Sequence, residues 1–162
     1  MHASRTIAAV TAALALTLVG CTASSGDEPA KDSGGGKSPA PEARRLDTAP
    51  DIAAALNDAG LNASTPKERT DEGYVSKVGG TSYGLTITDK AGQDALGESG
   101  INLFPNAEAL AAWVPLSKSF GGVAVTGDTW AVSLPTKSKE ARADSLLLAP
   151  QIAEALDGTV QR

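Results

Sequence analysis

The residue types that most often carry catalysis are scarce in this chain of 162 residues. Its only histidine is His2 and its only cysteine is Cys21. A serine, histidine and aspartate triad, a cysteine and histidine pair, and zinc or haem sites built on those ligands all need an imidazole or a free thiol. Beyond Cys21, the remaining catalytic options are serine with lysine, or carboxylates acting in pairs.

One serine and one lysine have the spacing of a known nucleophile pair. Ser64 and Lys67 match the Ser-x-x-Lys pattern of penicillin-binding enzymes and β-lactamases, in which the serine begins a helix and the lysine lies one turn further on. Here Pro66 falls inside the pattern, and the companion Ser-Asp-Asn and Lys-Thr-Gly sequences do not occur. The chain is also much too short for such an enzyme, so we do not expect catalysis at this position.

Several acidic residues gather in one loop, at Asp89, Asp94 and Glu98. Calcium binds several carboxylate oxygens, but Ala91 and Gln93 stand where a calcium loop of the EF-hand kind needs oxygen ligands. The pattern therefore indicates a solvated acidic loop, and we expect no metal and no cofactor. A Gly-Lys-Ser sequence at 36–38 has no strand before it and no helix after it, so it does not predict a phosphate-binding loop.

The charge balance limits the partners that the chain can bind. It has 14 lysines and arginines against 19 aspartates and glutamates, for a net charge of −5. Binding to nucleic acid or to anionic lipid headgroups needs a basic patch, and none is evident in the sequence. We therefore expect no nucleic-acid partner, and we expect membrane contact to come from covalent lipid.

The first 20 residues are organised like a signal peptide. One positive charge, at Arg5, precedes an apolar run from Ile7 to Val19. At 1.5 Å per residue, about 14 helical residues reach about 21 Å, which is short of a bilayer core of about 30 Å. The run is therefore predicted to be cleaved rather than to span the membrane.

The apolar run ends in Leu18-Val19-Gly20-Cys21, which resembles the lipobox of bacterial lipoproteins. The resemblance implies diacylglycerol on the Cys21 thiol, removal of residues 1–20, often a further acyl chain on the new amine, and anchoring on the extracytoplasmic face of the cell membrane. Two acyl chains provide a stable anchor. The Ala- and Gly-rich style of the chain also resembles the small lipoproteins of high-GC actinobacteria.

Two further regions follow the predicted signal peptide. Residues 21–47 contain the cysteine and then a stretch of Gly, Ser, Pro, Ala and charge, which cannot bury a core and is predicted to be a flexible linker. Residues 48–162 are predicted to form a single small α+β domain.

Hydrophobic periodicity predicts the elements of this domain. Helices are expected over 48–59, 106–120 and 138–157, with a kink or break at Pro115 and at Pro150. Strands are expected at 74–78, 83–88, 101–104, 123–125 and 130–134, with hairpin turns at Gly79-Gly80 and around Gly127-Asp128. This order favours a five-stranded, mostly antiparallel sheet with two to three helices on one face.

The alternation of the strands also predicts which side chains lie on each face of the sheet. Trp113 and Trp130 share the apolar faces of their elements, so core packing is favoured over ligand stacking. Small polar residues alternate with the apolar ones and are expected on the opposite face, where they form either a plain solvated surface or a partner surface: Thr86, Thr88, Asn102, Thr126 and Ser133.

These observations leave three classes of function. We expect a non-catalytic binding or interaction domain in the cell envelope that meets an envelope protein or a small molecule. The alternative is a small cell-envelope hydrolase with a carboxylate pair, which needs two acidic residues converging in a cleft. An accessory role as a tethered spacer or scaffold is the third class, and the sequence does not separate it from binding.

Overall fold

The computed structural model describes residues 46–93 and 97–162. The predicted signal peptide, Cys21, most of the predicted linker, and Asp94 lie outside the described residues.

The first helix, α1 (Ala49–Asp58), begins and ends as its sequence predicts. Thr48 caps it, because its Oγ1 accepts a hydrogen bond from the Asp51 backbone N–H at 3.3 Å. Gly60 follows the helix with a φ of +83°, a conformation that favours glycine. Ile52 and Leu56 are fully buried on one side of α1, which fixes the side that faces the sheet.

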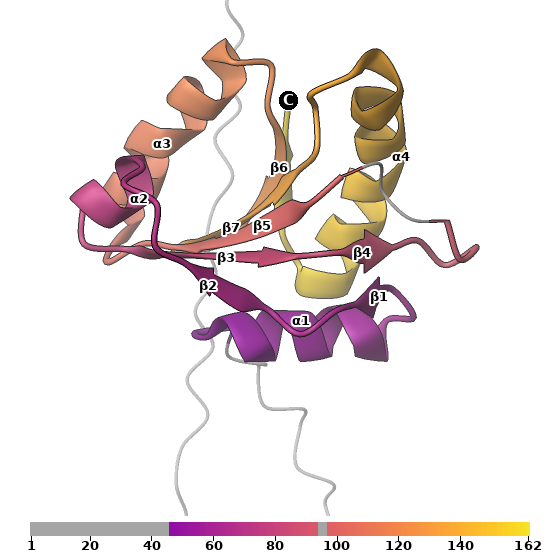
Figure 1. The fold of residues 1–162 in the computed structure, drawn as a ribbon. Helices are drawn as coiled ribbons and strands as arrows, with labels where there is room; N and C mark the ends of the chain where they lie inside the picture. Colours follow the sequence, from indigo (N-terminus) through magenta and orange to yellow (C-terminus); the bar gives the residue numbers. More distant parts are fainter. Residues whose placement is uncertain (1–45, 94–96) are drawn as a thin grey trace, which may run out of the picture. The chain divides into compact units, whose positions relative to one another are not determined.

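Six strands form one antiparallel sheet in the order β2-β3-β5-β7-β6-β8 (Figure 1). Their bounds are β2 Lys67–Arg69, β3 Thr81–Leu85, β5 Ser99–Leu103, β7 Trp130–Leu134, β6 Val123–Thr126 and β8 Thr159–Gln161. Two further strands, β1 (Asn62–Ala63) and β4 (Ile87–Thr88), pair only with each other. The predicted hairpin between β6 and β7 is confirmed, with the Gly127 N–H donating to the Trp130 carbonyl at 3.0 Å.

One face of the six-stranded sheet holds the main core. Helices α1 and α4 (Lys139–Leu156) cover it, and their fully buried Ile52, Leu56 and Ile152 belong to one cluster with strand residues. The strand residues of this cluster alternate along the chain, as a one-sided core requires. We call this side the apolar face; its members include Ile101, Val123, Val125, Trp130, Val132 and Leu134.

The other face carries a smaller cluster at one end. Helices α2 (Tyr74–Lys77) and α3 (Ala107–Ser119) contribute Val75 and Leu110, which pack with Phe104 and Ala131. Ala131 lies between Trp130 and Val132 in β7, so its side chain points away from the apolar face. The α+β class and the antiparallel sheet are therefore confirmed, whereas the expectation that the helices lie on one face is wrong.

The counts of elements also differ from the prediction. Among the described residues, the main sheet has six strands rather than five, and there are four helices. The strands missed by the sequence are β1, β2 and β8, which have two or three residues each. Segments this short have no measurable periodicity.

The segment 74–78 is not the predicted strand, because residues 74–77 form the short helix α2. Tyr74 and Val78 are four residues apart, a spacing that fits one helical turn as well as a strand. Gly79 and Gly80 do not turn a hairpin but end the helix, as their N–H groups donate to the carbonyls of Ser76 and Val75. Gly79 has a φ of +81°, as such helix stops require.

Helices α3 and α4 each run through an internal proline without ending. Pro115 and Pro150 are both exposed, so each ring occupies the outer side of its helix. A proline removes one backbone hydrogen bond, and in α4 the packing of Leu148 and Ile152 on either side of Pro150 holds the helix together.

Candidate functional site

The register of the sheet brings small and polar side chains together opposite the apolar face. Directly paired residues of antiparallel strands point to the same side. One row across the strands contains Arg69, Ser82, Asn102, Ala131 and Thr126. The next row contains Gly84, Gly100, Ser133 and Ala124. We call this side the polar face; Ser82, Asn102, Ser133 and Thr126 are its hydrogen-bonding residues.

A chain of hydrogen bonds crosses the middle of the polar face. Ser82 Oγ donates to Asn102 Oδ1 at 2.9 Å, and Asn102 Nδ2 donates to Ser133 Oγ at 3.3 Å. Ser133 Oγ also lies 3.3 Å from the Gly100 carbonyl oxygen, to which it donates. Asn102 is 8% exposed, while both serines are half-buried. The buried amide therefore fixes the orientation of the hydroxyl groups of two half-buried serines.

A second polar group lies at the β6 and β8 side of the same face. Gln161 Nε2 donates to Thr126 Oγ1 at 3.2 Å, and Thr126 Oγ1 donates to the Thr159 carbonyl at 3.4 Å. Thr126 is buried, so its hydroxyl group is used to hold β8 against β6.

An ion pair covers the glycines of the polar face. Arg69 Nη2 lies 2.6 Å from Glu98 Oε2, with the two side chains 35% and 59% exposed. A Cβ atom at Gly84 would overlap the Glu98 carboxylate and lie 3.0 Å from Arg69 Nε, and one at Gly100 would lie 3.8 Å from Arg69 Nη1. The absence of side chains at these two positions is what lets the ion pair lie flat on the sheet.

A hollow of about 170 Å³ opens beside Arg69 and Ser82, where β2, β3 and α2 meet. Nine residues line it, and three of them are acidic: Glu68, Arg69, Thr70, Asp71, Glu72, Ser76, Gly80, Thr81 and Ser82. Ser82, the first residue of the hydrogen-bonded chain, therefore borders a hollow that opens to solvent.

The structure brings together three of the five residues expected on the partner surface. Asn102, Thr126 and Ser133 lie on the polar face. Thr86 lies between β3 and β4, exposed, with its N–H donating to Ser64 Oγ at 2.9 Å. Thr88 belongs to β4, where it pairs with Asn62. The last two residues therefore lie beyond the end of β3, outside the six-stranded sheet.

The sequence did not point to Ser82 or Arg69 as site residues, and it placed Glu98 only in a solvated acidic loop. Ser82 could have been found, because Tyr83 and Leu85 alternate with it and with Gly84 in β3. Arg69 gave no such signal, since all three residues of β2 are charged.

The other candidate sites do not assemble. Ser64 precedes β2 and Lys67 begins it, so the two are joined by extended chain rather than one helical turn. Asp89 Oδ1 accepts hydrogen bonds from the N–H groups of Ala91 and Gln93 at 2.9 and 2.8 Å, which closes its own turn. Within 46–93 and 97–162, no three His, Cys, Asp or Glu side chains are close enough to hold a metal ion.

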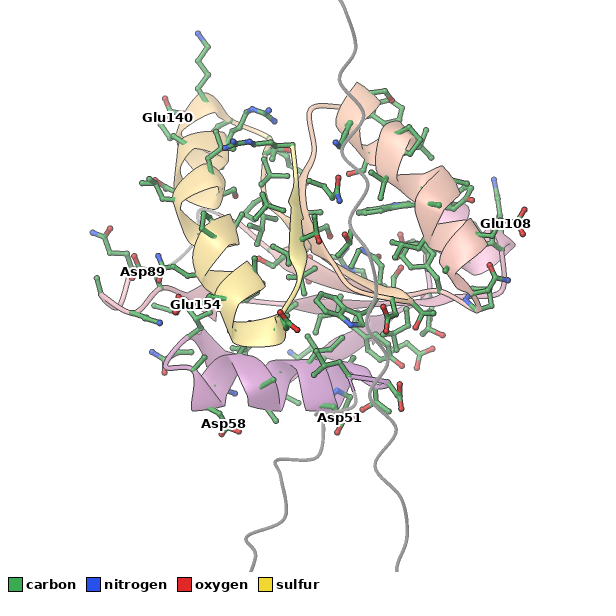
Figure 2. All side chains as sticks on the ribbon, turned by 180° about the vertical axis from the view of Figure 1, so that it is seen from behind. Asp51, Asp58, Asp89, Glu108, Glu140 and Glu154 are labelled. Atoms are coloured by element: carbon green, nitrogen blue, oxygen red, sulfur yellow. The ribbon has the colours of Figure 1, made fainter. Side chains whose placement is uncertain are left out.

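Two carboxylates share an open hollow of about 390 Å³ between α1 and α4. Asp58 and Glu154 line it together with Lys90 and three alanines. Both acidic residues are exposed, and Figure 2 shows Asp58 on the outward side of α1. A carboxyl group that serves as a general acid near neutral pH needs a desolvated, apolar setting. Over the described part of the chain, no acidic side chain is buried.

The two tryptophans pack within the protein. Trp130 is 5% exposed in the core of the apolar face, which confirms the prediction for this residue. Trp113 is half-buried beside Phe104, with ring centroids 5.7 Å apart and planes inclined at 52°. It belongs to the smaller cluster at the end of the polar face.

The comparisons with known proteins add no assignment, since the chain matches no family model, no curated protein and no solved structure. In the part of the chain that the structure describes, none of the helices is both long enough and apolar enough to cross a bilayer.

Proposed function

We propose that this protein is a lipoprotein anchored through Cys21 on the extracytoplasmic face of a bacterial membrane, and that its domain binds a partner in the cell envelope without catalysis. The resemblance of residues 18–21 to a lipobox supports the anchor. The observation that carries the binding role is the chain of hydrogen bonds through Ser82, Asn102 and Ser133.

The geometry of this chain favours recognition. Asn102 is nearly inaccessible, and its amide holds the two serine hydroxyls in place from between them. Groups that are oriented before binding lose less conformational entropy when a partner arrives. The half-exposed Arg69 and Glu98 lie next to them and add a donor and an acceptor that can exchange partners.

The scattered carboxylates support a binding role over the alternative of a hydrolase. Asp58 and Glu154, which share a hollow, are both exposed to solvent. The acid of a catalytic pair needs a desolvated, apolar setting, and neither of these carboxyl groups has one.

The binding role is tested by cross-linking intact cells that express the tagged, full-length protein. The test variant is Ser82→Arg, which fills the space between Arg69 and Asn102 with a charged side chain. The matched control is Thr86→Arg, because Thr86 lies four residues further along the chain, beyond the end of β3 and outside the hydrogen-bonded chain of Ser82, Asn102 and Ser133. We expect the cross-linked partner to fall by roughly tenfold, equivalent to about 1.4 kcal/mol of binding, in the first variant only.

Equal loss in both variants, with both folded by circular dichroism, would remove the polar face as the binding surface. Equal retention would do the same. If the wild-type protein cross-links to nothing, the envelope-protein partner is wrong, and binding of a small molecule is next tested by the thermal shift of the purified protein.

The anchor is tested separately with Cys21→Ala. Without the thiol there is no site for diacylglycerol, so we expect the variant to be released from the membrane or to persist as the uncleaved precursor. The measurement is cell fractionation together with the apparent mass of the product. A variant processed and membrane-bound like the wild type would show that the lipid assignment is wrong.

A further inference from the structure

We propose that one end of the domain contacts an anionic bilayer directly, through a surface that the fold assembles from α3, α4 and the strand ends between them. We call it the basic end and define it by seven residues: Leu116, Lys118, Phe120, Lys137, Lys139, Arg142 and Arg162. The proposal rests on the proposed function only for placing the chain at a membrane.

The strand register brings these residues to the same end of the sheet. Val123 pairs with Leu134 and Ala124 pairs with Gln161, so the chain just before β6, just after β7 and just after β8 meets there. Arg142, in the first turn of α4, donates a hydrogen bond to the carbonyl of Gly121, just beyond α3. Figure 1 shows the end of α3, the start of α4 and the C-terminal mark at this same end.

The last turns of α3 expose apolar side chains here. Leu110 is the one buried residue of α3, Trp113 and Val114 are half-buried, and the last turn of the helix is more exposed. Phe120 is 80% exposed and Leu116, one turn earlier, is 39% exposed. Among the described residues, the one other large apolar side chain exposed to this degree is Leu147, on the outer side of α4.

Positive charge is concentrated around these apolar residues. Residues 46–93 and 97–162 contain nine lysines and arginines, and five of them lie at the basic end. The opposing acidic residues there are Glu140, which Figure 2 labels at the start of α4, and Asp144 one turn further on. The rest of the described chain has four basic against twelve acidic residues, so the charge of the basic end is opposite to that of the molecule around it.

The combination of an exposed aromatic residue and flanking cations fits the interface of a bilayer. Apolar side chains enter the boundary between headgroups and acyl chains, while lysine and arginine remain among anionic headgroups. Neither the exposed aromatic residue nor the cations would indicate a membrane contact alone, since single exposed apolar residues are common on soluble domains. An anchored chain needs only a weak contact: the roughly 25 residues between Cys21 and α1 would have a reach of about 30 Å as a flexible linker, which keeps the membrane at high effective concentration.

The predicted lipidation makes a specific labelling experiment possible. With the Cys21 thiol blocked by lipid, Phe120→Cys introduces the only free thiol of the mature chain, where a fluorophore can be attached. The lipidated protein is reconstituted into vesicles of equal parts phosphatidylglycerol and phosphatidylcholine containing a headgroup spin label. The matched control is Leu147→Cys, which is exposed to a similar degree but lies outside the basic end.

We expect quenching at position 120 to exceed that at position 147 by roughly fivefold at low salt, and to fall to the control level at high salt or on pure phosphatidylcholine. The double change Lys137→Glu and Lys139→Glu should have the same effect. It should not weaken the fold, because both residues are exposed and acidic residues are favourable at the start of a helix.

Equal quenching at positions 120 and 147, or quenching at 120 that survives the double charge change, would overturn the proposal. Flotation separates this outcome from failure of the anchor, since a lipidated protein floats with phosphatidylcholine vesicles whatever the basic end does. If the protein does not float, the anchor fails. In that case the basic end is tested with unlipidated protein. Quenching of the Cys21→Ala, Phe120→Cys variant on the anionic vesicles is compared with quenching of the Cys21→Ala, Leu147→Cys variant.

Discussion

The two faces of the six-stranded sheet carry different side chains and are covered to different extents. On the apolar face, Ile101, Val125 and Val132 are completely buried beneath α1 and α4. On the polar face, the neighbouring positions in the same strands are Asn102, Ala124 and Ser133, and helices pack only at one end. Large branched side chains supply most of the free energy of folding, so stability should depend mainly on the apolar face.

Truncation of a core residue on the apolar face is expected to have the largest effect on stability. Ile101→Ala leaves a cavity under α1, and we expect it to lower the free energy of unfolding by about 3 to 4 kcal/mol. The conservative control Ile101→Val should cost about 1 kcal/mol. Urea denaturation of both variants measures this, and a loss below that of the control would mean that the apolar face is not the main source of stability.

The next largest effect on stability is expected at Gly127, where the backbone lies close to the Trp130 ring. A Cβ atom at Gly127 would overlap the Trp130 indole, so Gly127→Ala must displace a ring that is part of the core. Overpacking of this kind costs about 2 kcal/mol. The control, Asp128→Ala, lies in the same turn but is exposed, and its effect should stay within about 0.5 kcal/mol. Equal melting temperatures for the two variants would contradict the expected contact.

On the polar face, truncation should cost less than in the core. Asn102→Ala removes the partner of both serine hydroxyls and exposes them to water. We expect the free energy of unfolding to fall by about 1.5 kcal/mol, since Asn102 is buried and makes two hydrogen bonds. A loss as large as that of Ile101→Ala in the same urea titration would mean that the polar face also carries the fold.

The smallest effect is expected at the ion pair. Glu98→Gln removes a charge from a pair that is 35% and 59% exposed, and solvent screens such pairs. The free energy of unfolding should change by less than about 0.5 kcal/mol, and any change should shrink as salt is added. A loss above 1 kcal/mol, insensitive to salt, would show that Arg69 and Glu98 hold the sheet together.

The apolar periodicity predicted the larger elements well. Ile52 and Leu56 in α1, Val132 in β7, and Leu148 and Ile152 in α4 each repeat with the period of their element, and all are buried in the structure. Such elements bury one face along several turns or residue pairs, which leaves a readable pattern in the sequence.

The rest of the fold leaves weaker signals. The edge strand β2 contains only charged residues, and its place in the sheet depends on pairing with β3 rather than on burial. The partner surface was only partly predictable, because alternation assigns Thr86 to a face but does not show that the sheet ends before it. The basic end was not predictable from total charge, since its residues are spread from 116 to 162 and meet only after β6, β7 and β8 pair.

The short edge strands would matter if the protein is anchored to a membrane as proposed. Copies confined to two dimensions meet far more often than copies free in solution, and open sheet edges are where chains join into fibrils. Here the edges are β2 and β8, each three residues long, and β2 reads Lys67-Glu68-Arg69. A strand added to either edge would gain few hydrogen bonds, and at β2 it would meet alternating charges. Even if the proposed anchor crowds copies together, the sheet edges should therefore not lead to aggregation.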